Sequence, residues 1–232
     1  MKKILFLGLL GIIGVTAQAE NYSTLSVSYD NTQLWYGDNR GNDGGLGAIG
    51  VDGNKSSLNG FGLQYNYGIG LGSKPMNIEV GLKWNMGFKS ASITENYYGD
   101  FYENKFSTQF MRLSIPVSYI YHFHVNDMFA IAPYAGLDFR FNLLAKTKWK
   151  GYEDGELDYE ESWSWFDKAE MGDDVSKRFQ MGWHVGVRFE VKKCFLGVEY
   201  GTDFMPFWTS KWEGEKSHIN TGNLAVSVGY KF

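Results

Sequence analysis

The stretch FGLQYNYGIGL at residues 61–71, followed by IEVGLKWNMGF at residues 78–88, contains the pattern that decides the fold. In both segments a large apolar side chain stands at every second position, and glycine, polar or charged residues stand between. Side chains alternate between two faces along a β-strand, so this period of two predicts strands with one apolar and one small or polar face. The connecting residues 72–75, Gly-Ser-Lys-Pro, have the composition of a tight turn. The two strands are therefore expected to form an antiparallel hairpin.

The same alternation recurs along the rest of the chain, with a weaker example near its start. With the first two segments it gives eight strands. The further strands are expected at residues 25–29, 111–123, 129–143, 179–191, 196–204 and 224–232.

The connections between these strands alternate in length. Tight turns at one end and long loops at the other are typical of an up-and-down transmembrane β-barrel. Ten strands remain an alternative, if a further hairpin lies within residues 145–177. The short connections are residues 72–75, 124–127 and 192–194, and the long ones are residues 38–59, 90–106, 145–177 and 206–221.

The composition excludes several classes of protein. Aromatic residues make up 17% of the 232 residues and glycine accounts for 29, whereas there is one cysteine. No segment after residue 19 approaches the roughly 20 apolar residues of a spanning helix, and one thiol cannot form an intrachain disulfide. The aromatic content and a net charge of -4 argue against disorder, and the acidic balance gives no support for nucleic-acid binding.

The first 19 residues have the three parts of a secretory signal peptide. Lys2 and Lys3 give a positive start, residues 4–15 are an apolar run, and residues 17–19, Ala-Gln-Ala, match the small-x-small cleavage pattern. The alternative, an uncleaved membrane anchor, requires a longer apolar run. We therefore expect cleavage after Ala19 and a single barrel domain over residues 20–232.

The apolar face of the predicted barrel is expected to point outward. The interior of an eight-stranded barrel is just wide enough for side chains to fill it, and it could not hold the large side chains of every strand. The small and polar face fits that space, so the apolar face would meet lipid. The alternative is a soluble, lipocalin-type ligand-binding barrel.

Two prolines fall inside predicted strands, Pro116 on the inward face and Pro133 on the outward face. A closed barrel has no free edge where a missing N–H is harmless. We therefore expect a β-bulge near each of them.

The inward face carries five acidic and five basic residues. Charges in a narrow lumen are costly unless they are paired, so the pattern predicts a network of salt bridges. This network would fill and rigidify the barrel, or alternatively form the gate of a narrow pore. Its members are Glu79, Lys83, Arg112, Asp138, Arg140, Arg188, Glu190, Glu199, Asp203 and Lys231.

The long loop at residues 145–177 is the most distinctive predicted surface. It carries ten acidic and five basic residues, with aromatic residues interleaved. It is either a solvated hairpin tip or a recognition surface, since exposed aromatic residues are favoured anchors at interfaces. The candidate anchors are Trp149, Tyr152, Tyr159, Trp163, Trp165 and Phe166.

Several segments resemble bacterial outer-membrane β-barrels. The terminal VSVGYKF at residues 226–232, with Tyr230 and Phe232, is similar to the last strand that the barrel-insertion machinery recognises in that family. RLSIPV at residues 112–117 resembles the L-x-I-P strand of PorT-like barrel domains, and APYAG at residues 132–136 and GWHVG at residues 182–186 resemble the strands that follow. The resemblance implies an eight-stranded OmpA/OmpX-like fold and sets no activity.

The sequence offers little for catalysis. A site like that of lipid A-modifying outer-membrane enzymes would need a His-x-Ser pair, but His218 is followed two residues later by Asn220, so the nucleophile is missing. His122 and His184 are interpreted as inward members of the lumen network. We expect a non-enzymatic outer-membrane barrel with a structural or loop-mediated binding role, a narrow gated pore being the alternative.

The expected partners follow from that interpretation. They are outer-membrane lipid and lipopolysaccharide, the barrel-assembly machinery and an extracellular ligand at residues 145–177. No cofactor, metal or nucleic acid is predicted, and the barrel is expected to be a monomer.

Overall fold

The structure, a computed structural model, describes residues 21–36, 55–71, 75–97, 100–167, 175–212 and 215–232. The predicted leader and most of the predicted loop at residues 38–59 lie outside this part of the chain. Every regular element within it is a β-strand. The strands are β1 (Tyr22–Tyr36), β2 (Lys55–Gly70), β3 (Met76–Tyr97), β4 (Asp100–Tyr121), β5 (Phe123–His124), β6 (Phe129–Glu153), β7 (Glu156–Ser164), β8 (Val175–Ser176), β9 (Phe179–Val191), β10 (Cys194–Asp203), β11 (Trp208–Trp212) and β12 (Glu215–Lys231).

The described residues contain no helix that is both long enough and apolar enough to span a membrane.

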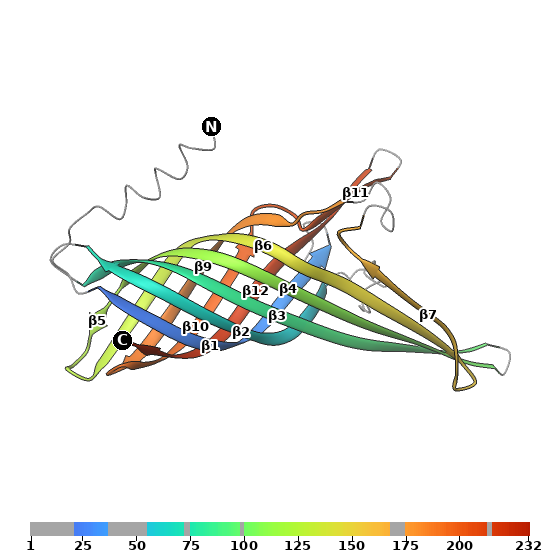
Figure 1. Cartoon of the computed structure of the whole chain (residues 1–232), viewed down its shortest axis with the longest axis horizontal. Coiled ribbons are helices and arrows are strands. Elements are labelled where there is room, and N and C mark those ends of the chain that lie inside the picture. Colours follow the sequence, from blue (N-terminus) through green and yellow to red (C-terminus); the bar gives the residue numbers. More distant parts are fainter. Residues whose placement is uncertain (1–20, 37–54, 72–74, 98–99, 168–174, 213–214) are drawn as a thin grey trace.

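Eight of these strands close into one antiparallel ring, in the order β1-β2-β3-β4-β6-β9-β10-β12 (Figure 1). The first and last strands pair along their length, from Thr24 opposite Lys231 to Tyr36 opposite Ile219, and this seam closes the ring. The hairpin predicted from the opening segments is β2–β3. The prediction of an all-β, eight-stranded antiparallel up-and-down barrel is confirmed.

The strands extend much further beyond the ring at one end of the barrel than at the other. At one end, which we call the turn end, the strands stop at short connections. At the other end β3, β4 and β6 continue far past the ring (Figure 1), and we call it the hairpin end because the β3–β4 and β6–β7 connections lie there. There β7 pairs with β6, which makes a four-stranded sheet in the order β3-β4-β6-β7. We call this sheet the blade; it consists of residues 88–97, 100–110, 145–153 and 156–164.

Most of residues 90–106 and 145–164 is therefore strand, and the prediction of long loops there is wrong. The cause is cross-strand pairing, which satisfies the backbone groups of both segments away from the barrel. The hairpin considered within residues 145–177 does exist, but it adds no strand to the ring. Strand β9 pairs with β6 only as far as Phe141, and β7 takes over that edge of β6 from Lys146 onward. The predicted loop at residues 206–221 likewise contains β11 and the first part of β12.

The barrel has its apolar face outside. Tyr65 and Leu82 are about half exposed, at 48% and 50%, whereas their inward neighbour Lys83 is 7% exposed. The same contrast runs around the ring, with leucine, valine and aromatic side chains outside and charged or hydroxyl side chains inside. The predicted orientation of the two faces is thus confirmed.

The two prolines are accommodated without a bulge at either position. Pro116 is buried and faces inward, and the β3–β4 register is unchanged across it although the ladder lacks the pairs at Ile115 and Pro116. Pro133 is exposed, pairs with Val187 on β9 and lies opposite the break between β4 and β5 on its other side. The one register shift of β4 against β6 falls between Met111 and Arg112. This shift lies four residues before Pro116, and no register shift adjoins either proline, so the prediction of a bulge near each of them is wrong.

Candidate functional site

The lumen contains a buried ion-pair network, and its best-defined pair joins opposite walls of the barrel. Arg188 on β9 donates from Nη1 and Nη2 to the two carboxylate oxygens of Glu79 on β3, both at 2.7 Å. Tyr22 donates its hydroxyl to Glu79 at 2.7 Å and lies 3.2 Å from His122 Nε2. The His122 ring in turn lies 3.1 Å from Glu190 through Nδ1. Bidentate geometry makes the central pair both strong and orientationally fixed.

A lysine forms the second group of the network. Lys83 on β3 lies 3.2 Å from Asp30 on β1 and 3.1 Å from Glu199 on β10, so one ammonium bridges two carboxylates. Tyr134 donates to Glu199 at 3.1 Å, and Asn223 donates to Asp30 at 2.8 Å. Both carboxylates are thereby compensated, as burial requires.

Arginines dominate the third group, nearest the hairpin end. Arg140 donates to Asp138 and to Asp203, both at 2.6 Å. His184 Nδ1 lies 3.1 Å from Asp138, and Arg112 lies 3.8 Å from Asp203 while its Nε donates to Asn142 at 3.1 Å. Three groups thus link the walls of the barrel.

The structure brings together all the charged residues predicted for the network except Lys231, whose ammonium instead lies 3.9 Å from the Tyr22 ring centroid. The sequence reading missed Asp30, which is 1% exposed and lies opposite Ala225. The inward position of Asp30 follows from the alternation in β1, which places Leu25, Val27 and Tyr29 on the outer face. The alternation is hard to recognise there because β1 has the weakest apolar pattern of the eight strands.

An apolar cluster, which we call the plug, closes the lumen at the hairpin end. Phe207 is central to it: its ring lies 5.4 Å from Phe110 and 6.1 Å from Trp165, centroid to centroid. Trp165 donates its indole N–H to Thr147 at 2.9 Å, and Thr147 contacts Thr108 at 3.1 Å. The buried members are Leu34, Leu58, Phe110, Ala145, Trp165, Phe207 and Ile219.

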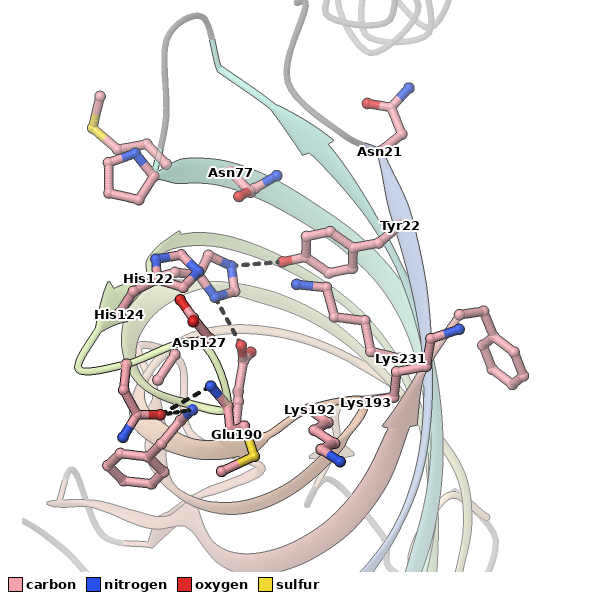
Figure 2. Close-up of a pocket in the computed structure, with 17 residues that line it drawn as sticks. Asn21, Tyr22, Asn77, His122, His124, Asp127, Glu190, Lys192, Lys193 and Lys231 are labelled. Atoms are coloured by element: carbon pink, nitrogen blue, oxygen red, sulfur yellow. Dashed lines mark hydrogen bonds and ion pairs between the residues drawn. The ribbon is translucent and has the colours of Figure 1, made fainter.

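At the turn end the lumen opens into a vestibule of about 490 Å³ (Figure 2). His122, Tyr22 and Glu190 form its inner boundary, and Lys193 and Lys231 line its side. The vestibule ends on the first ion-pair group, since Tyr22 and His122 belong to both. The described lumen is thus open at one end and filled at the other.

The predicted loop anchors separate into three groups in the structure. Trp149 stacks on Phe106 with centroids 5.7 Å apart and meets Tyr159 edge-on at 4.7 Å. Asn104 accepts hydrogen bonds from Trp149 at 2.9 Å and from Tyr159 at 2.7 Å. These three rings and Asn104 form one face of the blade, the face continuous with the lumen, and we call them the aromatic platform.

The other predicted anchors lie elsewhere. Trp165 is 7% exposed inside the plug, so its prediction as an exposed anchor is wrong: Phe207 and Thr147, distant in sequence, cover it. Trp163 and Phe166 pack against the plug. Tyr152 lies on the opposite face of the blade, below the Lys105 ammonium at 4.5 Å.

The outward face of the blade is polar. Glu160 on β7 pairs with Lys148 and, at 3.0 Å, with Lys150, both on β6. These hydrogen bonds hold the pKa of the Glu160 carboxyl below and the pKa of Lys150 above their ordinary values. The pairs are exposed to solvent, so they orient side chains more than they stabilise the sheet.

The predicted insertion signal lies at the seam. Tyr230 and Phe232 are 41% and 62% exposed on the outward face, with ring centroids 5.1 Å apart. The Phe232 N–H donates to the Ser23 carbonyl at 2.8 Å, which joins the last residue to the first strand. The recognition role assigned to these rings stays a prediction.

Comparison with known proteins identifies the family. The model of the outer membrane protein beta-barrel domain matches residues 5–232. The chain belongs to this family. It is therefore a Gram-negative outer-membrane β-barrel protein. In such barrels the short turns face the periplasm and the longer connections face the outside of the cell. A search of curated proteins gave no match.

Solved outer-membrane barrels are similar to the chain at low identity. Ail of Yersinia pestis is 15% identical over 92% of this chain and 100% of that chain, with a TM-score of 0.40. The Neisserial surface protein NspA is 14% identical over 91% and 97%, with a TM-score of 0.39. A major outer membrane protein of Thermus thermophilus is 14% identical over 90% and 99%, with a TM-score of 0.37.

Proposed function

We propose that this outer-membrane barrel is non-conducting and non-enzymatic, and that it acts as a binding protein at the cell surface through the blade. One observation carries the proposal: the described lumen is filled with paired charges and closed by the plug, while β3, β4 and β6 continue outward and, with β7, present exposed rings. The ion-pair network and the plug fill the barrel, and the side chains that a partner can reach lie on the blade.

The ion pairs argue against easy opening of the lumen. Displacing Arg140 would remove the shortest ion pair of both Asp138 and Asp203, and breaking a buried pair costs about 3–5 kcal/mol. The plug lies beyond that group and would have to move as well. A gated pore therefore requires two barriers to be displaced together.

The aromatic platform supports binding on the lumen-continuous face of the blade. Tyr159 is 37% exposed, and Asn104 fixes both Tyr159 and Trp149 by hydrogen bonds. Rings held in place lose little conformational entropy when a partner covers them, which is why Trp and Tyr dominate binding hot spots. The ligand class that suits this surface is an extracellular protein or glycan with an apolar face.

The test needs a variant that shortens the blade and leaves the plug intact. Deleting residues 150–172 would remove Trp165 from the plug together with β7 and the end of β6, so it would change the lumen and the blade at once. Replacing residues 151–159 by Asn-Gly joins Lys150 to Glu160, which are already paired, and keeps Trp163 and Trp165. The Asn-Gly turn suits a two-residue hairpin connection.

Two measurements decide the proposal. In planar bilayers, the wild-type protein and the shortened variant should both give no channel steps at any ionic strength. Cells producing the wild type should bind members of an immobilised panel of extracellular proteins and glycans, and the shortened variant and Trp149→Ala/Tyr159→Ala should lose that binding. The matched control is Trp183→Ala/Tyr200→Ala, which removes a lipid-side ring pair 6.1 Å apart.

Either of two results would overturn the proposal. Channel activity of the wild type would show that the lumen conducts, in favour of the pore. Binding that survives in both blade variants would show that the blade is not the binding surface.

A further inference from the structure

On three neighbouring strands, β3, β4 and β6, the outward side chains change from apolar to polar at the outer edge of the apolar band. On β4 the outward side chains from Tyr121 to Met111 are all apolar or aromatic. A tilted strand of that length rises about 25 Å, the height of the apolar band of outer-membrane barrels. The outward positions beyond Met111 therefore lie at the level of the lipid headgroups.

Serine and lysine occupy those positions in cross-strand rows. Pairing places Ser90, Ser107 and Lys148 in one row. The next row outward consists of Ser92, Lys105 and Lys150. Both rows lie on the face of the blade that continues the lipid-facing side of the barrel.

The two rows line a cavity of about 410 Å³. The side chains of Lys105 and Lys148 are 48% and 42% exposed, so their ammonium groups reach solvent. Three serines, Ser90, Ser92 and Ser107, line the same cavity, and their hydroxyls can donate to the same ligand. We call these six residues the serine–lysine patch.

The charge of the patch favours an anion. Lys105 pairs with Glu103 at 3.0 Å, and Lys148 and Lys150 share Glu160. Three lysines against two carboxylates leave an excess of one positive charge. Exposed pairs of this kind exchange readily with a stronger anion, because each contributes little on its own.

We propose that the serine–lysine patch binds the phosphate groups of the outer-leaflet lipid that surrounds the barrel. Lysine is a point-charge partner for phosphate, and serine hydroxyls donate to its oxygens. The patch faces sideways along the membrane surface, so a headgroup reaches it without leaving the bilayer. Each lysine near an anionic lipid surface contributes about 1 kcal/mol, a factor of about five in affinity.

The proposal is tested by native mass spectrometry of the detergent-solubilised full chain, titrated with lipid A carrying two, one or no phosphates. The wild type should prefer the bisphosphorylated form over the dephosphorylated form by about 25-fold, a factor of about five from each of Lys148 and Lys150. Lys148→Gln/Lys150→Gln should abolish most of this preference. Glu160→Gln, which removes the competing carboxylate, should strengthen it.

Two controls make the test specific. Lys192→Gln/Lys193→Gln makes the same charge change on exposed lysines at the turn end and should bind as the wild type does. Inorganic phosphate at the same concentration should not displace the lipid. Retained electrophoretic mobility of the unheated, folded barrel verifies each variant, and Lys105→Gln replaces the double variant if that one does not fold.

Three results would overturn the proposal. Equal binding of the three lipid A forms by the wild type would exclude phosphate recognition. An equal loss in the turn-end control would show that net charge, and not the patch, sets the affinity. Displacement of the lipid by inorganic phosphate would mean that the patch takes free anions.

Discussion

The barrel wall and the blade are parts of the same strands, yet their polarity is reversed. On β4 the inward side chain is Arg112 within the barrel and Phe106 within the blade, whereas the outward side chain changes from Leu113 to Lys105. Strand β6 shows the same exchange, with Asn142 inside the barrel and Trp149 inside the blade. The reversal occurs at the level of the plug, to which β4 contributes Phe110 and β6 contributes Ala145.

The difference shows that alternation and orientation are separate pieces of information. A period of two specifies a strand wherever it occurs, because successive side chains always point to opposite faces. Which face is apolar depends on what lies outside the strand, namely lipid along the barrel and water along the blade. The level at which polarity reverses therefore reports the membrane boundary.

The largest difference between the two regions should come from breaking an ion pair. Arg188→Leu leaves Glu79 buried without its bidentate partner, so the free energy of unfolding should fall by about 3–5 kcal/mol. Unfolding by guanidinium in lipid vesicles measures this. Lys150→Leu, which breaks an exposed pair of the blade, should leave the midpoint unchanged.

The double variant Arg188→Leu/Glu79→Leu sharpens this prediction. It should recover most of the lost stability, since removing both charges also removes the desolvation cost. A double variant as unstable as the single one would mean that shape, and not charge compensation, governs this position.

The second largest loss of stability is expected from a substitution in the plug. Phe207→Ala removes a 2% exposed ring that contacts Phe110, Trp165 and Phe166, and should lower the free energy of unfolding by about 3 kcal/mol. Phe106→Ala on the partly exposed platform should cost less than half of that in the same unfolding assay. Equal costs would show that the platform is as tightly packed as the plug.

The same substitution at two heights of β4 tests the membrane boundary itself. Val117→Arg places a cation on the lipid face and should cost about 2 kcal/mol, whereas Ser107→Arg, on the same face beyond Met111, should cost about 0–1 kcal/mol. Both values come from unfolding in vesicles. A similar cost at the two positions would place the blade inside the bilayer and would remove the basis for lipid binding at the serine–lysine patch.

The sequence was sufficient for the ring because each strand carries its own period-two pattern. It also placed most of the ion-pair residues, since inward positions follow from the same alternation. Asp30 was not predicted because β1 has a weak apolar pattern, although its alternation with Leu25, Val27 and Tyr29 indicates an inward position.

The extent of the blade and the burial of Trp165 could not be read in the same way. Both depend on contacts between segments far apart in the chain, such as Trp165 with Phe207 and β4 with β6. A polar, aromatic stretch has the same local pattern whether it is a free loop or a paired strand. On β4 the reversal of polarity also hid the strand, because its apolar side chains move from odd-numbered positions such as Leu113 to even-numbered ones such as Phe106.

The smallest expected effect concerns the aromatic platform. Asn104→Ala removes the acceptor that Trp149 and Tyr159 share, and should cost about 1 kcal/mol, confined to the blade. Hydrogen exchange measured by mass spectrometry should show faster exchange in residues 146–164 and none of this change in the barrel strands. Thr94→Ala, an exposed position on the other face of the blade, is the matched control.

The result would also separate two descriptions of the blade. Faster exchange limited to the blade means that it opens independently of the barrel, as expected for a sheet whose far end has no lipid around it. Faster exchange that spreads into β9 or β10 would mean that the plug couples the two regions. In that case a partner bound to the platform would change the lumen as well, and the barrel wall and the blade would form one cooperative unit.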